Sequence, residues 1–168
     1  SEITGYLATM MSFMHDLSGE VRYLNAAVKA AEWLNRTAHT SGSFRCLFPL
    51  RPSRFDYKHQ QLYAFDTGVI LNGLCEVIRL TGRSDLLASA RRAGDWLIES
   101  AQLPNGGFQA VFDLSEGRYL LNDAEWSLCP GSYHTKVAIG LLNLASLTGE
   151  NRYRDAAVRV CDFALSFQ

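Results

Sequence analysis

Three residues of this 168-residue chain are candidates for acid–base chemistry: Asp66, His134 and Glu125. Asp66 and His134 each open an apolar stretch, residues 65–82 and 133–149, and take equivalent places in two copies of one pattern. A carboxylate can act as acid, base or hydroxyl acceptor, and a histidine at a positive helix end resists protonation. Asp66 and Glu125 would suit glycoside hydrolysis if they lie roughly 5–10 Å apart. We therefore predict that the three side chains converge on one cavity.

Two long loops, residues 45–65 and 109–133, precede these stretches and are rich in polar and aromatic residues. Aromatic faces stack on sugar rings, while carboxylates and amides bind hydroxyl groups. The guanidinium of Arg45, close in sequence to Arg51 and Arg54, suits a uronate carboxylate. The predicted substrate-binding residues are His59, Tyr63, Asp123, Trp126, Tyr133 and Arg45.

Each of these residues also has an ordinary structural interpretation. Aspartate is among the preferred N-cap residues, so Asp66 could cap its helix as well as face a cavity. His134 could be a partly exposed polar residue that begins a helix. The loop residues could form a solvated surface, and the sequence leaves these alternatives open.

The elements that position the candidates repeat along the chain. Gly19, Gly82 and Gly149 each follow Leu-Ser or Leu-Thr, with spacings of 63 (82 − 19) and 67 (149 − 82) residues. Glycine suits the left-handed residue that ends a helix. Residues 41–50 and 105–114 also match, and their phenylalanines are expected to pack between hairpins: Phe44, Phe48, Phe108 and Phe112.

Each repeat combines two helices of different character. The first is apolar almost all round and belongs inside, whereas the second is amphipathic and belongs outside. A period near 65 residues exceeds the roughly 34–47 residues of common helical solenoids. The predicted fold is all-α, with about three helical hairpins forming half of an (α/α)6 toroid, as one domain or fragment over residues 1–168. The predicted repeats are residues 1–64, 65–131 and a truncated third at 132–168.

Nearly the whole chain resembles the six-hairpin (α/α)6 toroid proteins that act on sugars, most clearly in "FDTGVILNGLCEVIRLTGRSDLLASARRAGDWLIESAQLPNGGF", residues 65–108. This group includes unsaturated uronyl hydrolases, N-acylglucosamine 2-epimerases and toroid proteins of bacterial polysaccharide clusters. The pattern is specific for the toroid and says little about the reaction. The resemblance implies an inner-rim aspartate, matched by Asp66, and a cavity histidine for proton transfer, matched by His134.

Composition excludes several other classes. A net charge of −1 and a pI near 6.4 provide no basic surface for nucleic acid or an anionic membrane. No apolar run reaches the ~20 residues that span a bilayer. The cysteines lack the paired spacing of zinc sites, so we predict free thiols, no metal or other cofactor, and a cytoplasmic location with secretion left open. They are Cys46, Cys75, Cys129 and Cys161.

Three functions remain as expectations. The first is hydrolysis or epimerisation of a sugar, neutral or acidic, in bacterial polysaccharide metabolism. The second is a non-catalytic helical-repeat module that binds glycan or protein. The third is a toroid like terpenoid cyclases and prenyltransferases, which share the "NGGF" segment but need an aspartate-rich motif that this chain lacks. The expected partners are a sugar or oligosaccharide, and a second copy or the remaining half of the toroid.

Overall fold

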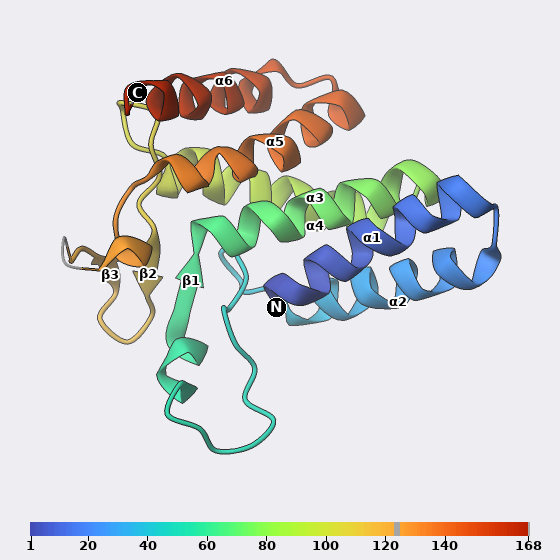
Figure 1. Ribbon diagram of the computed structural model, residues 1–168, viewed down its shortest axis with the longest axis horizontal. Helices are drawn as coiled ribbons and strands as arrows, with labels where there is room; N and C mark the ends of the chain where they lie inside the picture. The colour runs from blue at the N-terminus through green and yellow to red at the C-terminus, as the bar shows by residue number, and fades with distance from the viewer. Residues whose placement is uncertain (123–124, 168) are drawn as a thin grey trace.

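The computed structural model describes residues 1–122 and 125–167. Six α-helices pair into three consecutive hairpins, which confirms the predicted half-toroid (Figure 1). The elements in chain order are α1 (Glu2–Ser18), α2 (Val21–Thr37), η1 (Asp56–Gln60), β1 (Gln61–Tyr63), α3 (Ala64–Thr81), α4 (Ser84–Asp95), η2 (Trp96–Ala101), β2 (Val111–Asp113), β3 (Arg118–Leu120), η3 (Trp126–Leu128), η4 (Ser132–His134), α5 (Thr135–Thr148) and α6 (Asn151–Leu165).

Helices α1, α3 and α5 form an inner layer and run in the same direction, so their N-termini gather at one end (Figure 1). The return helices α2, α4 and α6 form the outer layer. Gly19, Gly82 and Gly149 end the inner helices with φ angles of 70°, 67° and 72°. This left-handed conformation is the one that the repeated glycine predicts. The tight turn then returns the chain along the outside.

Glycines also set the separation of the inner helices. A Cβ atom on Gly73 of α3 would lie 2.5 Å from the carbonyl oxygen of Gly5 in α1, and one on Gly140 of α5 would lie 2.6 Å from that of Gly68 in α3. Both distances are far below van der Waals contact. The same glycine-to-backbone contact therefore joins α1 to α3 and α3 to α5.

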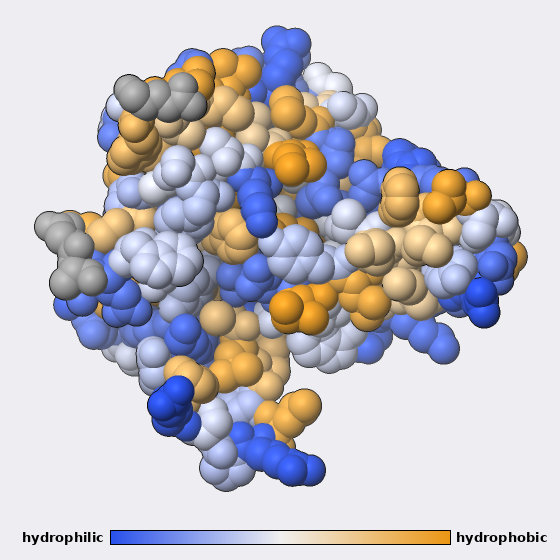
Figure 2. All heavy atoms as spheres, in the orientation of Figure 1, coloured by the Kyte–Doolittle hydropathy of each residue, from blue (hydrophilic) through white to orange (hydrophobic). Residues whose placement is uncertain are grey.

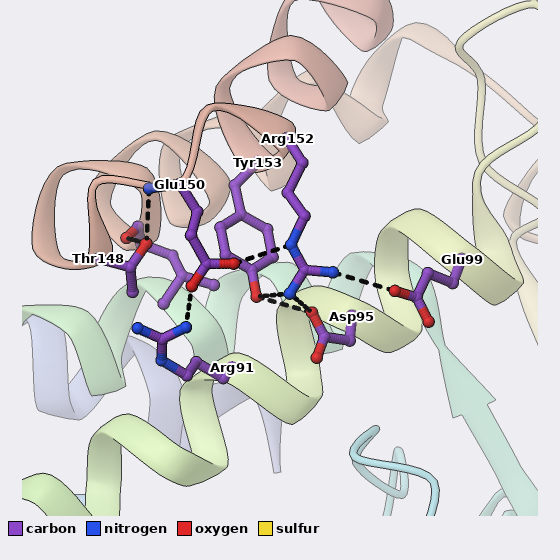
Figure 3. Close-up of polar contacts among 8 residues, drawn as sticks. Arg91, Asp95, Glu99, Thr148, Glu150, Arg152 and Tyr153 are labelled. Carbon is purple, nitrogen blue, oxygen red and sulfur yellow. Dashed lines mark hydrogen bonds and ion pairs between the residues drawn. The ribbon is translucent and has the colours of Figure 1, made fainter.

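The outer helices add ion pairs to this packing. Arg152 of α6 forms ion pairs with Asp95 of α4 at 2.6 Å and with Glu99 of η2 at 3.0 Å (Figure 3). The buried Tyr153 donates a hydrogen bond from its hydroxyl to Asp95 at 2.6 Å, and Glu150 pairs with Arg91. These polar contacts join α4 to α6 next to the buried, alanine-rich faces of the two helices.

The chain is mostly helical, and it also contains a small antiparallel sheet that the sequence did not predict. The sheet order is β1-β2-β3, with Leu62 opposite Phe112 and Phe112 opposite Tyr119. It joins the two long loops and holds β1 directly before α3 (Figure 1). Phe44 and Phe108 are buried in the core at the matching positions of their repeats, as predicted.

Exposed apolar side chains lie along α1. Ile3, Leu7 and Met10 are 76%, 45% and 56% exposed, and Figure 2 shows apolar atoms gathered over the region of this helix. Among the described residues, no helix is both long enough and apolar enough to cross a membrane.

The glycine contacts predict the effect of a single methyl group on stability. In an exposed helix, Gly→Ala stabilises by up to about 1 kcal/mol. At Gly140 the methyl group would meet backbone, so we expect Gly140→Ala to lower the free energy of unfolding by about 1–3 kcal/mol. Urea unfolding followed by circular dichroism measures it. Ser146→Ala, at an exposed position of α5, should change stability by less than about 0.5 kcal/mol. A stabilised Gly140→Ala variant would refute the close contact.

Candidate functional site

A pocket of about 420 Å³ lies at the gathered N-termini of the inner helices. Each inner helix contributes residues from its first turn, and the segments around them complete the wall. This volume falls in the range of small-molecule sites. The lining residues are Glu2 of α1, Phe65 and Asp66 of α3, Thr135 and Lys136 of α5, together with Cys46, Lys58, Tyr63, Trp126, Ser127 and Tyr133.

Asp66 is the buried acid of this pocket, with 4% of its surface exposed. It lies in the first turn of α3, but Tyr63 is the N-cap residue and no side chain forms a capping hydrogen bond. Within the described residues, its Oδ2 atom is buried and has no hydrogen-bond partner. The structure therefore does not support the interpretation of Asp66 as a simple cap, and one of its carboxyl oxygens is buried without a hydrogen-bond partner among the described residues.

Burial, followed by the nearby negative charge of Glu2, raises the pKa of Asp66 to about 7. A hydrogen bond with the Cys46 thiol and the charge of Lys58 oppose this shift. Desolvation dominates because an ionised carboxylate loses much of its hydration in such a site. Near neutral pH, Asp66 is thus present in both protonated and ionised forms, which is the condition that suits a general acid or base.

Aromatic rings form a second feature of the pocket. The ring of Tyr133 contacts Phe65 at a centroid distance of 5.8 Å and Trp126 at 5.3 Å, the latter nearly perpendicular at 88°. Trp126 is 72% exposed. An exposed indole beside a buried acid provides an apolar face on which a sugar ring can stack.

The structure does not place His134 in this pocket. His134 is fully buried. The centroid of its ring lies 4.0 Å from that of Tyr133 and 5.9 Å from that of Phe108. Its Nδ1 accepts a hydrogen bond from the backbone N–H of Gly131 at 3.4 Å, and burial lowers its pKa to about 4. Asp66, His134 and Glu125 therefore do not converge on one cavity, because only Asp66 lines the pocket. His134 is neutral and supports Tyr133 from behind.

Glu125 lies near the pocket without lining it. Its exposed side chain accepts a hydrogen bond from Ser127 at 3.1 Å. Its charge is one of several causes that raise the pKa of Tyr63, after burial as the largest. Three of the residues predicted to bind substrate, Tyr63, Trp126 and Tyr133, line the pocket.

Two other predicted residues hold the loop instead. His59 donates from Nδ1 to the carbonyl of Leu47 at 2.8 Å and packs against Phe48. Arg45 donates to the carbonyl of His59 at 2.6 Å. Neither lines the pocket, and the predicted Asp123 lies outside the described residues. These hydrogen bonds join residues 45 and 47 to η1, which directly precedes β1 and Tyr63.

Sequence reasoning missed several pocket residues, among them Glu2, Cys46, Lys58 and Lys136. Glu2 was detectable, because it opens the first inner helix just as residues 65 and 66 open the second. Cys46 was considered only for metal and disulfide chemistry. Within residues 1–122 and 125–167, no group of three His, Cys, Asp or Glu residues could hold a metal ion.

No protein-family model and no curated protein matches the sequence, whereas solved structures match its fold. A sugar epimerase from a ruminal bacterium gives a TM-score of 0.78 at 17% identity, over 95% of this chain and 41% of that chain. Cellobiose 2-epimerase from Spirochaeta thermophila DSM 6192 gives 0.72 at 16% identity, over 95% and 41%.

A third match is an inactive variant of the α-1,6-mannanase GH76A of Salegentibacter sp. HEL1_6 in complex with α-1,6-mannotriose. Its TM-score is 0.76 at 15% identity, over 95% of this chain and 45% of that chain. The chain thus has the fold of the six-hairpin toroid proteins that act on sugars, and spans less than half their length. Two adjacent aspartates are replaced in that inactive mannanase, and this sequence contains no two adjacent aspartates.

The raised pKa of Asp66 predicts how stability depends on pH. Between the unfolded pKa of about 3.8 and the folded pKa of about 7, the folded state binds more protons, so stability falls as pH rises. One pKa unit corresponds to about 1.4 kcal/mol. We expect wild type to lose about 4 kcal/mol relative to Asp66→Asn between about pH 4 and about pH 8. Urea unfolding at a series of pH values measures this difference.

Wild type has to be compared with Asp66→Asn because His134 changes the stability with pH in the direction opposite to Asp66. Its lowered pKa makes stability fall as pH drops through the same region. Both proteins keep His134, so its contribution cancels. Asp155→Asn, at an exposed position of α6, should follow the wild-type profile. Parallel profiles for wild type and Asp66→Asn would contradict the assignment.

Proposed function

We propose that the pocket binds a saccharide and that Asp66 serves there as acid or base in its hydrolysis or epimerisation. The observation that carries this proposal is the buried carboxyl group of Asp66, with Oδ2 unpartnered among the described residues and a pKa of about 7 at the pocket wall. Perturbed carboxylates in clefts mark candidate functional sites.

Hydrolysis by the two-carboxylate route needs a second acidic group. Glu2 lines the same pocket, and its charge helps to raise the pKa of Asp66. In this proposal Asp66 donates a proton to the leaving oxygen, and Glu2 serves as nucleophile or activates water. Glu125, beside the pocket, is the alternative partner.

Of the three residues predicted to transfer protons, only Asp66 lines the pocket. Epimerisation would therefore depend on Asp66 without a second predicted group. His134 lies behind Tyr133, and its low pKa favours a supporting position over proton transfer. Hydrolysis is therefore the preferred reaction. Proteins with the same fold include mannanases and cellobiose 2-epimerase, which supports a sugar as the ligand.

The second candidate is a glycan-binding module without turnover. It is favoured by the absence of His134 from the residues that line the pocket. Under this function the aromatic wall binds the sugar, and Asp66 only accepts or donates hydrogen bonds.

Replacement of Asp66 separates the two candidates. We expect wild type to cleave or epimerise at least one member of a panel that includes α-1,6-mannotriose and cellobiose, with turnover about 100-fold lower in Asp66→Asn. Chromatography of the products measures turnover, and calorimetry measures binding. Binding without turnover in wild type would establish the module, and absence of any sugar binding would refute both functions.

Trp126 should contribute to affinity rather than to rate. Loss of an aromatic stacking surface costs about 1 kcal/mol, so we expect Trp126→Ala to raise the Kd about fivefold. The turnover of bound sugar should stay close to wild type. Val158→Ala removes exposed apolar surface from α6 and should leave the Kd unchanged. Equal effects of the two substitutions would contradict a sugar platform at Trp126.

A further inference from the structure

The distribution of lysine in the chain is uneven. The sequence has thirteen arginines and only three lysines, Lys29, Lys58 and Lys136. Two of the three, Lys58 and Lys136, line the pocket that holds Asp66. Both come from segments at the N-terminal end of the inner layer, Lys58 from η1 and Lys136 from the first turn of α5.

Each of these ammonium groups lies over an aromatic ring of the pocket wall. Lys58 Nζ lies 5.8 Å from the ring centroid of Tyr63 and equally far from that of Phe55, outside the pocket lining. Lys136 Nζ lies 5.6 Å from the ring centroid of Phe65 and 5.9 Å from that of Tyr6, which also lies outside this lining. Tyr63 and Phe65 stand on either side of Ala64, directly before Asp66. Rings at this distance attract a cation. The ion pairs found within residues 1–122 and 125–167 include neither lysine.

Lys136 also opposes the local electrostatics of its helix. It is the second residue of α5, and the N-terminus of a helix carries partial positive charge that disfavours a cation. The N-termini of α1 and α3 lie at the same end of the layer (Figure 1). A residue that breaks a local rule beside a buried acid points to a functional requirement.

The charges of the pocket define the ligand that would complete it. The lining contains two basic residues, Lys58 and Lys136, and two acidic residues, Glu2 and Asp66. Asp66 is ionised in only part of the molecules near neutral pH. The two lysines equal the two acids in number, and the helix N-termini add partial positive charge. The buried, unpartnered Oδ2 of Asp66 meanwhile requires a hydroxyl or similar polar group.

We propose that the ligand is an acidic sugar, whose anionic group is bound by Lys58 and Lys136 while a neighbouring oxygen meets Asp66. A uronate carboxylate is the simplest such group. This inference rests on the proposed function and narrows its substrate class. Lys58 and Lys136 are the specificity-determining residues, in place of Arg45, which holds the backbone of His59.

A charged sugar and its uncharged counterpart provide the test. Oligouronates of the gluco, galacto and manno series are titrated calorimetrically, each beside its methyl ester, which keeps the ring and removes the charge. We expect one oligouronate to bind about tenfold tighter than its ester. Its Kd should rise as NaCl increases from about 0.02 M to about 0.3 M, because salt screens the ion pairs. The Kd of the ester should stay constant.

The lysine variants assign the effect to residues. Lys58→Met and Lys136→Met keep side-chain length and contact with the rings, and each should weaken oligouronate binding about tenfold without changing ester binding. Lys29→Met, on the exposed side of α2, is the matched control and should bind like wild type. Circular dichroism confirms folding of each variant.

The possible failures are distinguishable. Equal affinity for an oligouronate and its ester, lost in Asp66→Asn, would overturn the acidic-sugar inference and leave the saccharide pocket standing. Tighter oligouronate binding that survives both lysine substitutions would also overturn it. Failure of every sugar to bind, including α-1,6-mannotriose and cellobiose, would overturn this inference together with the proposed function.

Discussion

The close contact between inner helices is the constraint on which the rest of the structure depends. Gly73 lies against the carbonyl of Gly5, and Gly140 lies against that of Gly68, so three helices pack side by side in one direction. Parallel packing brings three N-termini together at one end. First-turn residues of the three inner helices, among them Asp66 and Lys136, meet there and form part of the pocket wall.

Two opposing electrostatic effects act on Asp66 at this end. A helix N-terminus stabilises a carboxylate by about 0.3–1 kcal/mol, whereas burial shifts a carboxyl pKa by as much as about 3–5 units, each worth about 1.4 kcal/mol. Burial is the larger effect, and the pKa rises to about 7. The protein thus holds a group that destabilises its folded state near neutral pH. Such a cost is typical of functional sites, where stability is exchanged for reactivity.

The sequence predicted the hairpins well because helix-ending glycines and apolar periodicity are local signals. Asp66, at the start of the second apolar stretch, lines the pocket. The three-residue strands carry no comparable signal, since their pairing depends on contacts between distant loops. The prediction for His134 failed by one position. The 67-residue spacing pairs Asp66 with Tyr133, and it pairs His134 with the buried Thr67.

The same spacing compares the two contacts within the inner layer, α1 with α3 and α3 with α5, with the outward faces of α1 and α5, which form its two edges. The edges differ from the contacts in their residues. Met10 takes the place of Gly73 one repeat earlier (73 − 63), and Thr135 takes the place of Gly68 one repeat later (68 + 67). A helix packed on either edge would meet a side chain where the internal junctions have glycine, so it would lie farther away. Because Thr135 lines the pocket, a wider junction there would leave space beside Asp66.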